Sequence, residues 1–197
     1  MNNDIRNNFL FVFFGHNRTG KTQTALEIIK GWKQTHKGMV YTFDNQGRYN
    51  DIRDKKINLS DSWEKNFLND KNIKNSLLVI DDYRILCPSN TMSQGFLDIL
   101  NIKNEYCIDI IIITHAPGLI IERLTYFITH YFLFYTQSTA KGFKDRMSNY
   151  ETVYKLKDII NEYVKKHGRG DFPIFPYIIF DNETEKINFI NMPLLKL

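Results

Sequence analysis

The chain has 197 residues and a formal net charge of +4, and 43% of its residues are hydrophobic against 24% charged. This length fits one ordinary domain, and the balance is that of a globular protein, which excludes a disordered or collagen-like chain. Its two cysteines form no C-x-x-C motif, and no apolar run reaches the ~18–20 residues of a membrane span, so we expect no disulfide framework, zinc site or integral membrane segment.

Short apolar runs alternate with helical patterns along the first 135 residues, which predicts an α/β sheet covered by helices on both faces. The expected strands are, in chain order, Phe9–Phe14, Met39–Phe43, Leu77–Ile80, Ile110–Ile113 and Tyr131–Tyr135. The expected helices follow the first strand up to about Gly38, lie within Asp51–Asn75, and span Met92–Asn104 and Pro117–Phe127.

The C-terminal part predicts a loop over Thr136–Ser148, a helix over Glu151–Lys166 and two strands that extend or flank the sheet as a hairpin. Between Lys141 and Gly170 the sequence has eight Lys or Arg against four Asp or Glu, and this surplus equals the net charge of the chain. Such a segment either attracts a phosphate backbone or is a solvated face. We expect one domain, with a core of about 9–135 and a basic helix and hairpin of about 141–191.

The residues after the first strand match the phosphate-binding pattern G-x-x-x-x-G-K-[ST]. They are Gly15, His16, Asn17, Arg18, Thr19, Gly20, Lys21 and Thr22, and Gln23 follows. Glycines allow a tight turn whose N–H groups face phosphate oxygens, at the start of a helix that adds positive potential. Lys21 can bridge the β- and γ-phosphates, and the Thr22 hydroxyl can ligate Mg²⁺. The pattern predicts that these nine residues bind ATP with Mg²⁺; the alternative is a glycine turn that binds no phosphate.

The third strand runs into two carboxylates, Asp81 and Asp82. One carboxylate at the tip of a strand can hold Mg²⁺, and a second can orient or deprotonate the attacking water. We assign Asp81 to the metal and Asp82 to the water. Glutamate is commoner in the second role, and the alternative for Asp82 is that it starts a turn or caps the next segment of the chain.

The fourth strand ends in two polar residues, Thr114 and His115. In P-loop proteins with an extra strand between the phosphate loop and the acidic strand, this tip lies beside the γ-phosphate. Either side chain can then hydrogen-bond the γ-phosphate or the water and sense hydrolysis, and His115 is preferred. The alternative is a structural histidine.

The order of these segments resembles the HerA–FtsK superfamily of P-loop ATPases, over about Phe9 to Tyr135. Closest to it are the zonula occludens toxin-like assembly ATPases of filamentous phages and the small viral genome-packaging ATPases. In the family the fourth strand usually ends in Thr-Gln, and a proline and a short helix with an arginine follow. Here these places are filled by Thr114, His115, Pro117 and Arg123. The departures are His115 for the usual glutamine and Asp82 for the glutamate of many members.

The resemblance implies a three-layer P-loop NTPase sandwich, mainly parallel, with strand order 5-1-4-3-2. It implies an ATP-hydrolysing motor that moves or packages DNA in viral genome packaging or virion assembly, with a capsid, portal or assembly partner. The working form would be a ring, commonly a hexamer, in the cytoplasm (of the host, if the protein is viral). Arg123 would then reach a neighbour's γ-phosphate as an arginine finger; the alternative is a solvated charge beside Glu122.

Other functions stay open at this point. The string Leu77–Asp82 is also found in helicase loaders and AAA-type ATPases, although the fourth strand lacks their usual Thr-Ser-Asn. A small-molecule kinase would need an arginine-rich lid, for which Arg48 and Arg53 are the only candidates. A nucleotide-gated interaction protein would bind ATP and hydrolyse it poorly.

Overall fold

The structure is a computed structural model that describes residues 8–58, 62–85, 91–116, 119–137, 149–170 and 174–192. Its sheet contains the strands β1 (Leu10–Phe14), β2 (Val40–Phe43), β3 (Lys55–Lys56), β4 (Leu77–Asp81), β5 (Asp109–Thr114), β6 (His130–Leu133), β7 (Tyr177–Asp181) and β8 (Ile187–Ile190). The helices are α1 (Lys21–Thr35), α2 (Trp63–Leu68), α3 (Gln94–Ile102), α4 (Glu122–Thr125) and α5 (Tyr150–His167), with a 3₁₀ turn η1 at Tyr83–Ile85.

The eight strands follow the order β3-β2-β4-β5-β1-β6-β7-β8. The strands from β3 to β6 are parallel, and the hairpin β7–β8 continues the sheet antiparallel to β6. The five strands expected from the apolar runs keep the expected order, so the P-loop NTPase fold class is confirmed. The sheet differs in the added β3, which consists of two exposed lysines and therefore carries no apolar strand signal.

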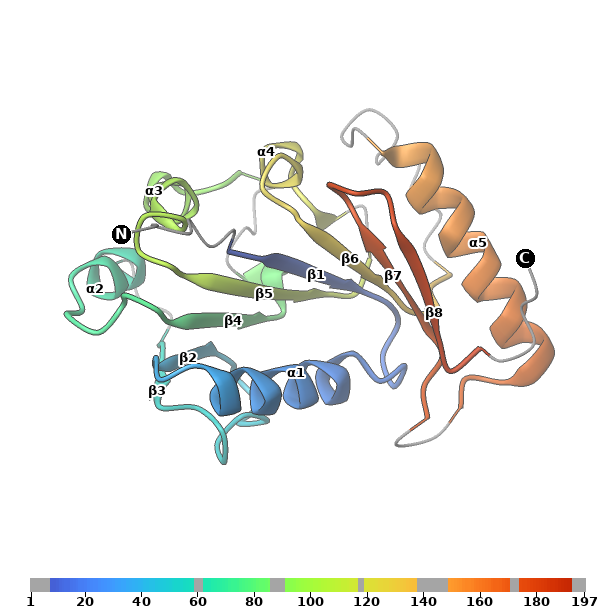
Figure 1. Ribbon diagram of the computed structural model, residues 1–197, viewed down its shortest axis with the longest axis horizontal. Coiled ribbons are helices and arrows are strands. Elements are labelled where there is room, and N and C mark those ends of the chain that lie inside the picture. The colour runs from blue at the N-terminus through green and yellow to red at the C-terminus, as the bar shows by residue number, and fades with distance from the viewer. Residues whose placement is uncertain are drawn as a thin grey trace.

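Helices cover the two faces unequally, as Figure 1 shows: α1 lies on one side of the sheet, and α2, α3 and α4 lie on the other. The side chains of β5 alternate between these layers. Ile110 and Ile112 pack in the core beneath α2 to α5, whereas Ile111 and Ile113 pack in the core with α1. This alternation follows from the period of two in a strand, and it makes continuous isoleucine runs the natural sequence of a sheet buried on both sides.

The amino ends of the central strands hold α1 in place through a buried carboxylate. Asp109 accepts hydrogen bonds from the Phe9 backbone N–H at 3.1 Å and from Trp32 Nε1 at 2.7 Å. Asp109 is fully buried, and such a carboxylate is tolerated because donors satisfy it. The far end of α1 is therefore fixed to β5, which positions its first turn.

Two helices differ in extent from the sequence expectation. The first ends at Thr35, and the fourth is a single turn, Glu122–Thr125; Pro117 and Gly118 lie outside the described residues. Most of the expected loop over 136–148 also lies outside them. Within the described ranges, no helix is both long and apolar enough to cross a bilayer.

Candidate nucleotide site

The phosphate loop connects the end of β1 to the first residue of α1. Gly20 has a φ of 93°, in the left-handed region that favours glycine, and a Cβ there would lie 2.4 Å from Phe175 Cγ. A Cβ on Gly15 would lie 2.6 Å from Phe134 Cβ. Both glycines of the motif are therefore required by close packing: Gly15 against the residue that follows β6, and Gly20 against the segment that leads into β7.

Lys21 lies inside this loop, with only 5% of its surface exposed. Its ammonium donates to the backbone carbonyls of Gly15 at 2.6 Å and His16 at 2.7 Å. Burial lowers the pKa of Lys21 to about 8, and the nearby Asp81 carboxylate partly opposes this shift. The loop thus holds a cation whose charge is poorly solvated, which favours binding of an anion.

A cavity of about 400 Å³ opens over the loop at the carboxyl ends of the parallel strands. Its described lining consists of Asn17, Arg18, Thr19, Gly20, Lys21, Thr22, Gln23, Gln46, Arg48, Asp81, Ile113 and His115. The lining joins the loop and first turn of α1 to the ends of β4 and β5 and to the segment after β2. Seven of the nine residues expected to contact nucleotide line this cavity. The other two, Gly15 and His16, accept hydrogen bonds from the Lys21 ammonium through their backbone carbonyls.

The guanidinium of Arg48 contacts both residues that are expected to hold Mg²⁺, Thr22 and Asp81. Arg48 Nη1 donates to Asp81 Oδ2 at 3.1 Å and lies 3.3 Å from Thr22 Oγ1. Tyr49, which is fully buried, donates its hydroxyl to the same Asp81 oxygen at 3.1 Å. A hydroxyl and a carboxylate that already share a positive group fit a hard divalent cation, which prefers oxygen ligands.

Asp81 itself is strongly desolvated. Burial raises its pKa, and the Arg48 guanidinium and the Tyr49 hydroxyl pull the pKa in the opposite direction. Asp44, at the end of β2, adds a second negative charge that also raises it. The carboxylate therefore depends on nearby positive charge to stay ionised.

Of the two polar residues at the end of β5, His115 lines the cavity. Burial lowers its pKa, and Lys21 lowers it further, while Asp82 and Asp81 raise it. Thr114 is 1% exposed and, by the alternation of the strand, shares the face of Ile112; its hydroxyl has no hydrogen-bond partner among the described residues. The geometry brings His115, and not Thr114, to the phosphate loop.

Asp82 follows β4 with a φ of 71°, and its N–H donates to the Ile113 carbonyl at 3.2 Å. Its carboxylate acts electrostatically on His115, although Asp82 is not among the described residues that line the cavity. Arg123 is not among them either: it is exposed on α4, on the face of the sheet opposite α1. Within one chain, the structure therefore gathers the acidic pair and His115 and leaves Arg123 apart.

Three residues of the segment after β2 were missed as site residues by sequence reasoning: Gln46, Arg48 and Tyr49. Asp44 anchors this segment, because its carboxylate accepts from the backbone N–H groups of Gln46 at 2.8 Å and Tyr49 at 3.4 Å. The sequence indicated a turn there, and Arg48 was considered only as a candidate for the lid of a kinase. A polar run directly after a strand that neighbours the acidic strand is the one signal that could have suggested site residues.

The basic segment is only partly described, and Lys141, Lys144 and Arg146 lie outside the described residues. In the described part, Lys165 pairs with Glu162 at 2.5 Å, and Arg169 lies over the ring of Tyr135 at 4.7 Å. Lys165, in the last turn of α5, and Arg169, just after the helix, therefore both have partners within the chain.

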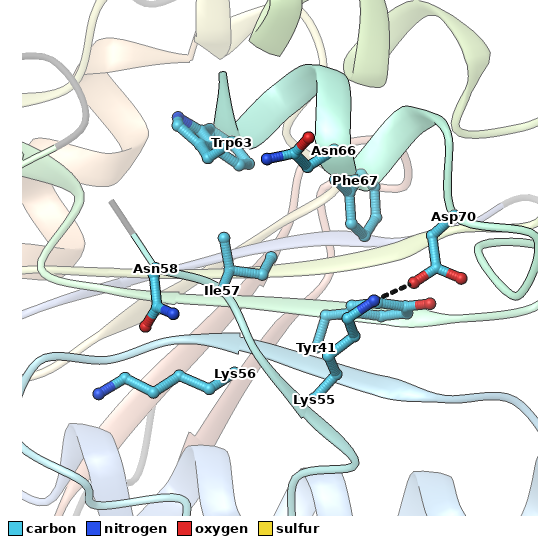
Figure 2. Close-up of a pocket in the computed structure, with 9 residues that line it drawn as sticks. All are labelled: Tyr41, Lys55, Lys56, Ile57, Asn58, Trp63, Asn66, Phe67 and Asp70. Atoms are coloured by element: carbon cyan, nitrogen blue, oxygen red, sulfur yellow. Dashed lines mark hydrogen bonds and ion pairs between the residues drawn. The ribbon is translucent and has the colours of Figure 1, made fainter. Parts of the chain in front are cut away.

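A second cavity of about 380 Å³ lies between α2 and the β2–β3 edge (Figure 2). Aromatic rings of Tyr41, Trp63 and Phe67 line it, and Lys55 donates to Asp70 across its rim at 2.5 Å. It shares no lining residue with the cavity over the phosphate loop. The two cavities are therefore separate sites on the sheet.

No protein-family model matches the chain, and no curated protein matches it in sequence. Solved structures do share its fold. The genome packaging NTPase B204 from Sulfolobus turreted icosahedral virus 2, in complex with AMPPCP, matches with a TM-score of 0.66 at 13% identity, over 93% of this chain and 97% of that one. The DNA-packaging ATPase B204 from Sulfolobus turreted icosahedral virus matches with a TM-score of 0.62 at 16% identity, over 92% and 96%.

The cytoplasmic domain of the type VII secretion ATPase EccC from Thermomonospora curvata matches with a TM-score of 0.59 at 12% identity. That match covers 93% of this chain and 23% of the EccC chain. At these identities the likeness shows the fold: this chain has the architecture of P-loop ATPases, including viral packaging ones.

Proposed function

We propose that the chain is an ATP-hydrolysing motor that moves or packages DNA in viral genome packaging or virion assembly. The observation that carries the proposal is one cavity that joins Lys21 and Thr22 of the phosphate loop to Asp81 and His115 at the strand ends. The full-length match in fold to viral packaging NTPases supports the viral context.

The roles of the residues follow from their positions. The loop N–H groups and Lys21 would bind the β- and γ-phosphates, and Thr22 and Asp81 would hold Mg²⁺, which when bound supplies charge neutralisation at the phosphates. Asp82 would orient or deprotonate the attacking water, and His115 would contact the γ-phosphate or that water.

The test of the motor function is the ATPase rate with and without double-stranded and single-stranded DNA. A translocase that tracks the phosphate backbone is expected to hydrolyse ATP faster on DNA of any sequence, because backbone contacts carry no sequence information. A rate that is unchanged by both kinds of DNA would favour a nucleotide-gated interaction protein.

The basic segment is expected to contribute to DNA binding. Replacing Lys141, Lys144 and Arg146 with glutamine should weaken DNA binding and reduce the slope of log affinity against log salt by about 0.7–0.9 per lost phosphate contact. The control replaces three exposed lysines elsewhere, Lys30, Lys65 and Lys71. Equal slopes in the two variants would mean that the segment is a solvated face.

Nucleotide affinity is expected to fall as pH rises above about 8. Burial holds the pKa of Lys21 at about 8, and bound phosphates favour the ammonium form, so binding above this pH takes up a proton. The fall should approach about tenfold per pH unit. Titration of a fluorescent ATP analogue between pH 7 and 9.5 measures it, and Lys21→Arg, which stays charged, should flatten the profile. If nucleotide affinity depended on pH in the same way in the parent and in Lys21→Arg, Lys21 would not be the group whose charge controls binding.

The two aspartates are expected to separate binding from hydrolysis. Asp82→Asn should bind Mg²⁺ and ATP like the parent but hydrolyse ATP about 10²–10⁴-fold more slowly, because the water loses its base. Asparagine tolerates the left-handed backbone at this position, so the change is mild for the fold. Asp81→Asn should instead weaken Mg²⁺-dependent binding. ATP titrations with and without Mg²⁺ test this, and indistinguishable binding defects would overturn the division of roles.

A further inference from the structure

The feature that the proposed function does not use is Arg48. Its guanidinium contacts both Thr22 Oγ1 and Asp81 Oδ2, the two oxygens to which the proposal assigns the metal, at 3.3 Å and 3.1 Å. A guanidinium cannot lose its charge in a protein, so a permanent cation stands between these two oxygens. Arg48 and a divalent cation cannot both make these contacts.

The surroundings allow the guanidinium to leave while the backbone stays. Its neighbour Tyr49 is fully buried and bonded to Asp81, and Asp44 accepts from two backbone N–H groups of the same segment. The Arg48 side chain, in contrast, is 37% exposed, and its other hydrogen bond goes to the exposed side chain of Gln46. The arginine side chain is thus partly exposed, whereas the backbone that carries it is held by hydrogen bonds, and Gly47, with a φ of 69°, provides the turn that precedes it.

We infer that Arg48 is a cation latch of the nucleotide site: its guanidinium takes the metal position between Thr22 and Asp81 and has to leave it before a Mg²⁺–nucleotide complex can bind. The inference rests on the proposed nucleotide function. The latch neutralises Asp81, which would otherwise face the nucleotide phosphates as a bare negative charge. It also means that Mg²⁺ binding has to break two Arg48 contacts.

The latch predicts opposite effects of Arg48→Gln on the two nucleotide complexes. Without a divalent cation, ADP should bind more weakly to the variant than to the parent, because the Asp81 charge is no longer masked. With Mg²⁺, ADP should bind as tightly or more tightly, because no guanidinium has to be displaced. The dissociation constant of ADP in EDTA, divided by its dissociation constant in Mg²⁺, should therefore be roughly ten- to a hundredfold larger for the variant than for the parent. This factor corresponds to the free energy of one charge-assisted hydrogen bond.

The experiment measures ADP affinity in EDTA and in Mg²⁺, by fluorescence of a labelled nucleotide, and Mn²⁺ affinity in the ADP complex by electron paramagnetic resonance. The matched control is Tyr49→Phe, which removes the other donor to the same Asp81 oxygen without removing a charge; it should change the ratio much less. Arg48→Lys, which keeps a positive charge, should lie nearer the parent. Circular dichroism of each variant checks the fold.

Each other outcome overturns the latch. Equal weakening in EDTA and Mg²⁺ would make Arg48 a structural residue, and weakening confined to the Mg²⁺ complex would make it a phosphate ligand. If Arg48→Gln does not fold, Arg48→Met, which is also neutral and of similar length, repeats the test, and a ratio equal to that of the parent would decide against the latch. If the parent binds no nucleotide in either condition, the proposed function itself fails.

Discussion

Lys21→Ala is expected to abolish ATP hydrolysis and to weaken ATP binding by roughly ten- to a hundredfold. The ammonium is the buried positive charge of the phosphate loop, and the loss of a charge-assisted hydrogen bond costs about 1.5–3 kcal/mol. Fluorescent-nucleotide titration and a phosphate-release assay measure the two effects. The control is Lys30→Ala, an exposed lysine of the same helix that pairs with Glu27. If Lys21→Ala hydrolysed ATP like the parent, the site would be wrongly assigned.

Arg123→Ala is expected to reduce hydrolysis by about 10³–10⁵-fold while leaving ATP binding unchanged. An arginine that contacts the transferring phosphoryl group stabilises charge that grows in the transition state, so binding of the ground state barely needs it. Arg123 is exposed and is not among the described residues that line the cavity of its own chain, so the proposed finger role requires a neighbouring subunit. The same oligomer should form with and without the substitution.

Mixing experiments make the shared site testable. In a mixture of Arg123→Ala and Lys21→Ala proteins, one subunit type supplies an intact pocket and the other an intact finger, so mixed rings should regain activity. Glu122→Gln, which changes a neighbouring charge on the same helix, is the control and should behave like the parent. If the mixture is inactive and the specific activity of the parent does not rise with protein concentration, Arg123 is a surface charge that takes no part in hydrolysis.

The sequence determined the features that depend on local patterns. Strands such as the one containing Ile110–Ile113 can be predicted from a continuous apolar run, because a strand buried on both faces does not alternate with polar residues. The phosphate loop can be predicted because its backbone requires glycine at positions 15 and 20 and phosphate binding requires a cation at Lys21. These patterns predicted where the five main strands lie along the chain and where a phosphate would bind, whereas the order of the strands in the sheet came from the resemblance to the HerA–FtsK superfamily.

The tertiary structure decided which side chains meet in the site. Arg48 is 33 residues from Asp81 in the chain, and the two are brought together only because β2 pairs with β4. The choice between Thr114 and His115 likewise depends on which face of β5 lies against the phosphate loop. Loop residues carry no periodic signal, and their partners come from distant strands, so only packing of the whole sheet places them.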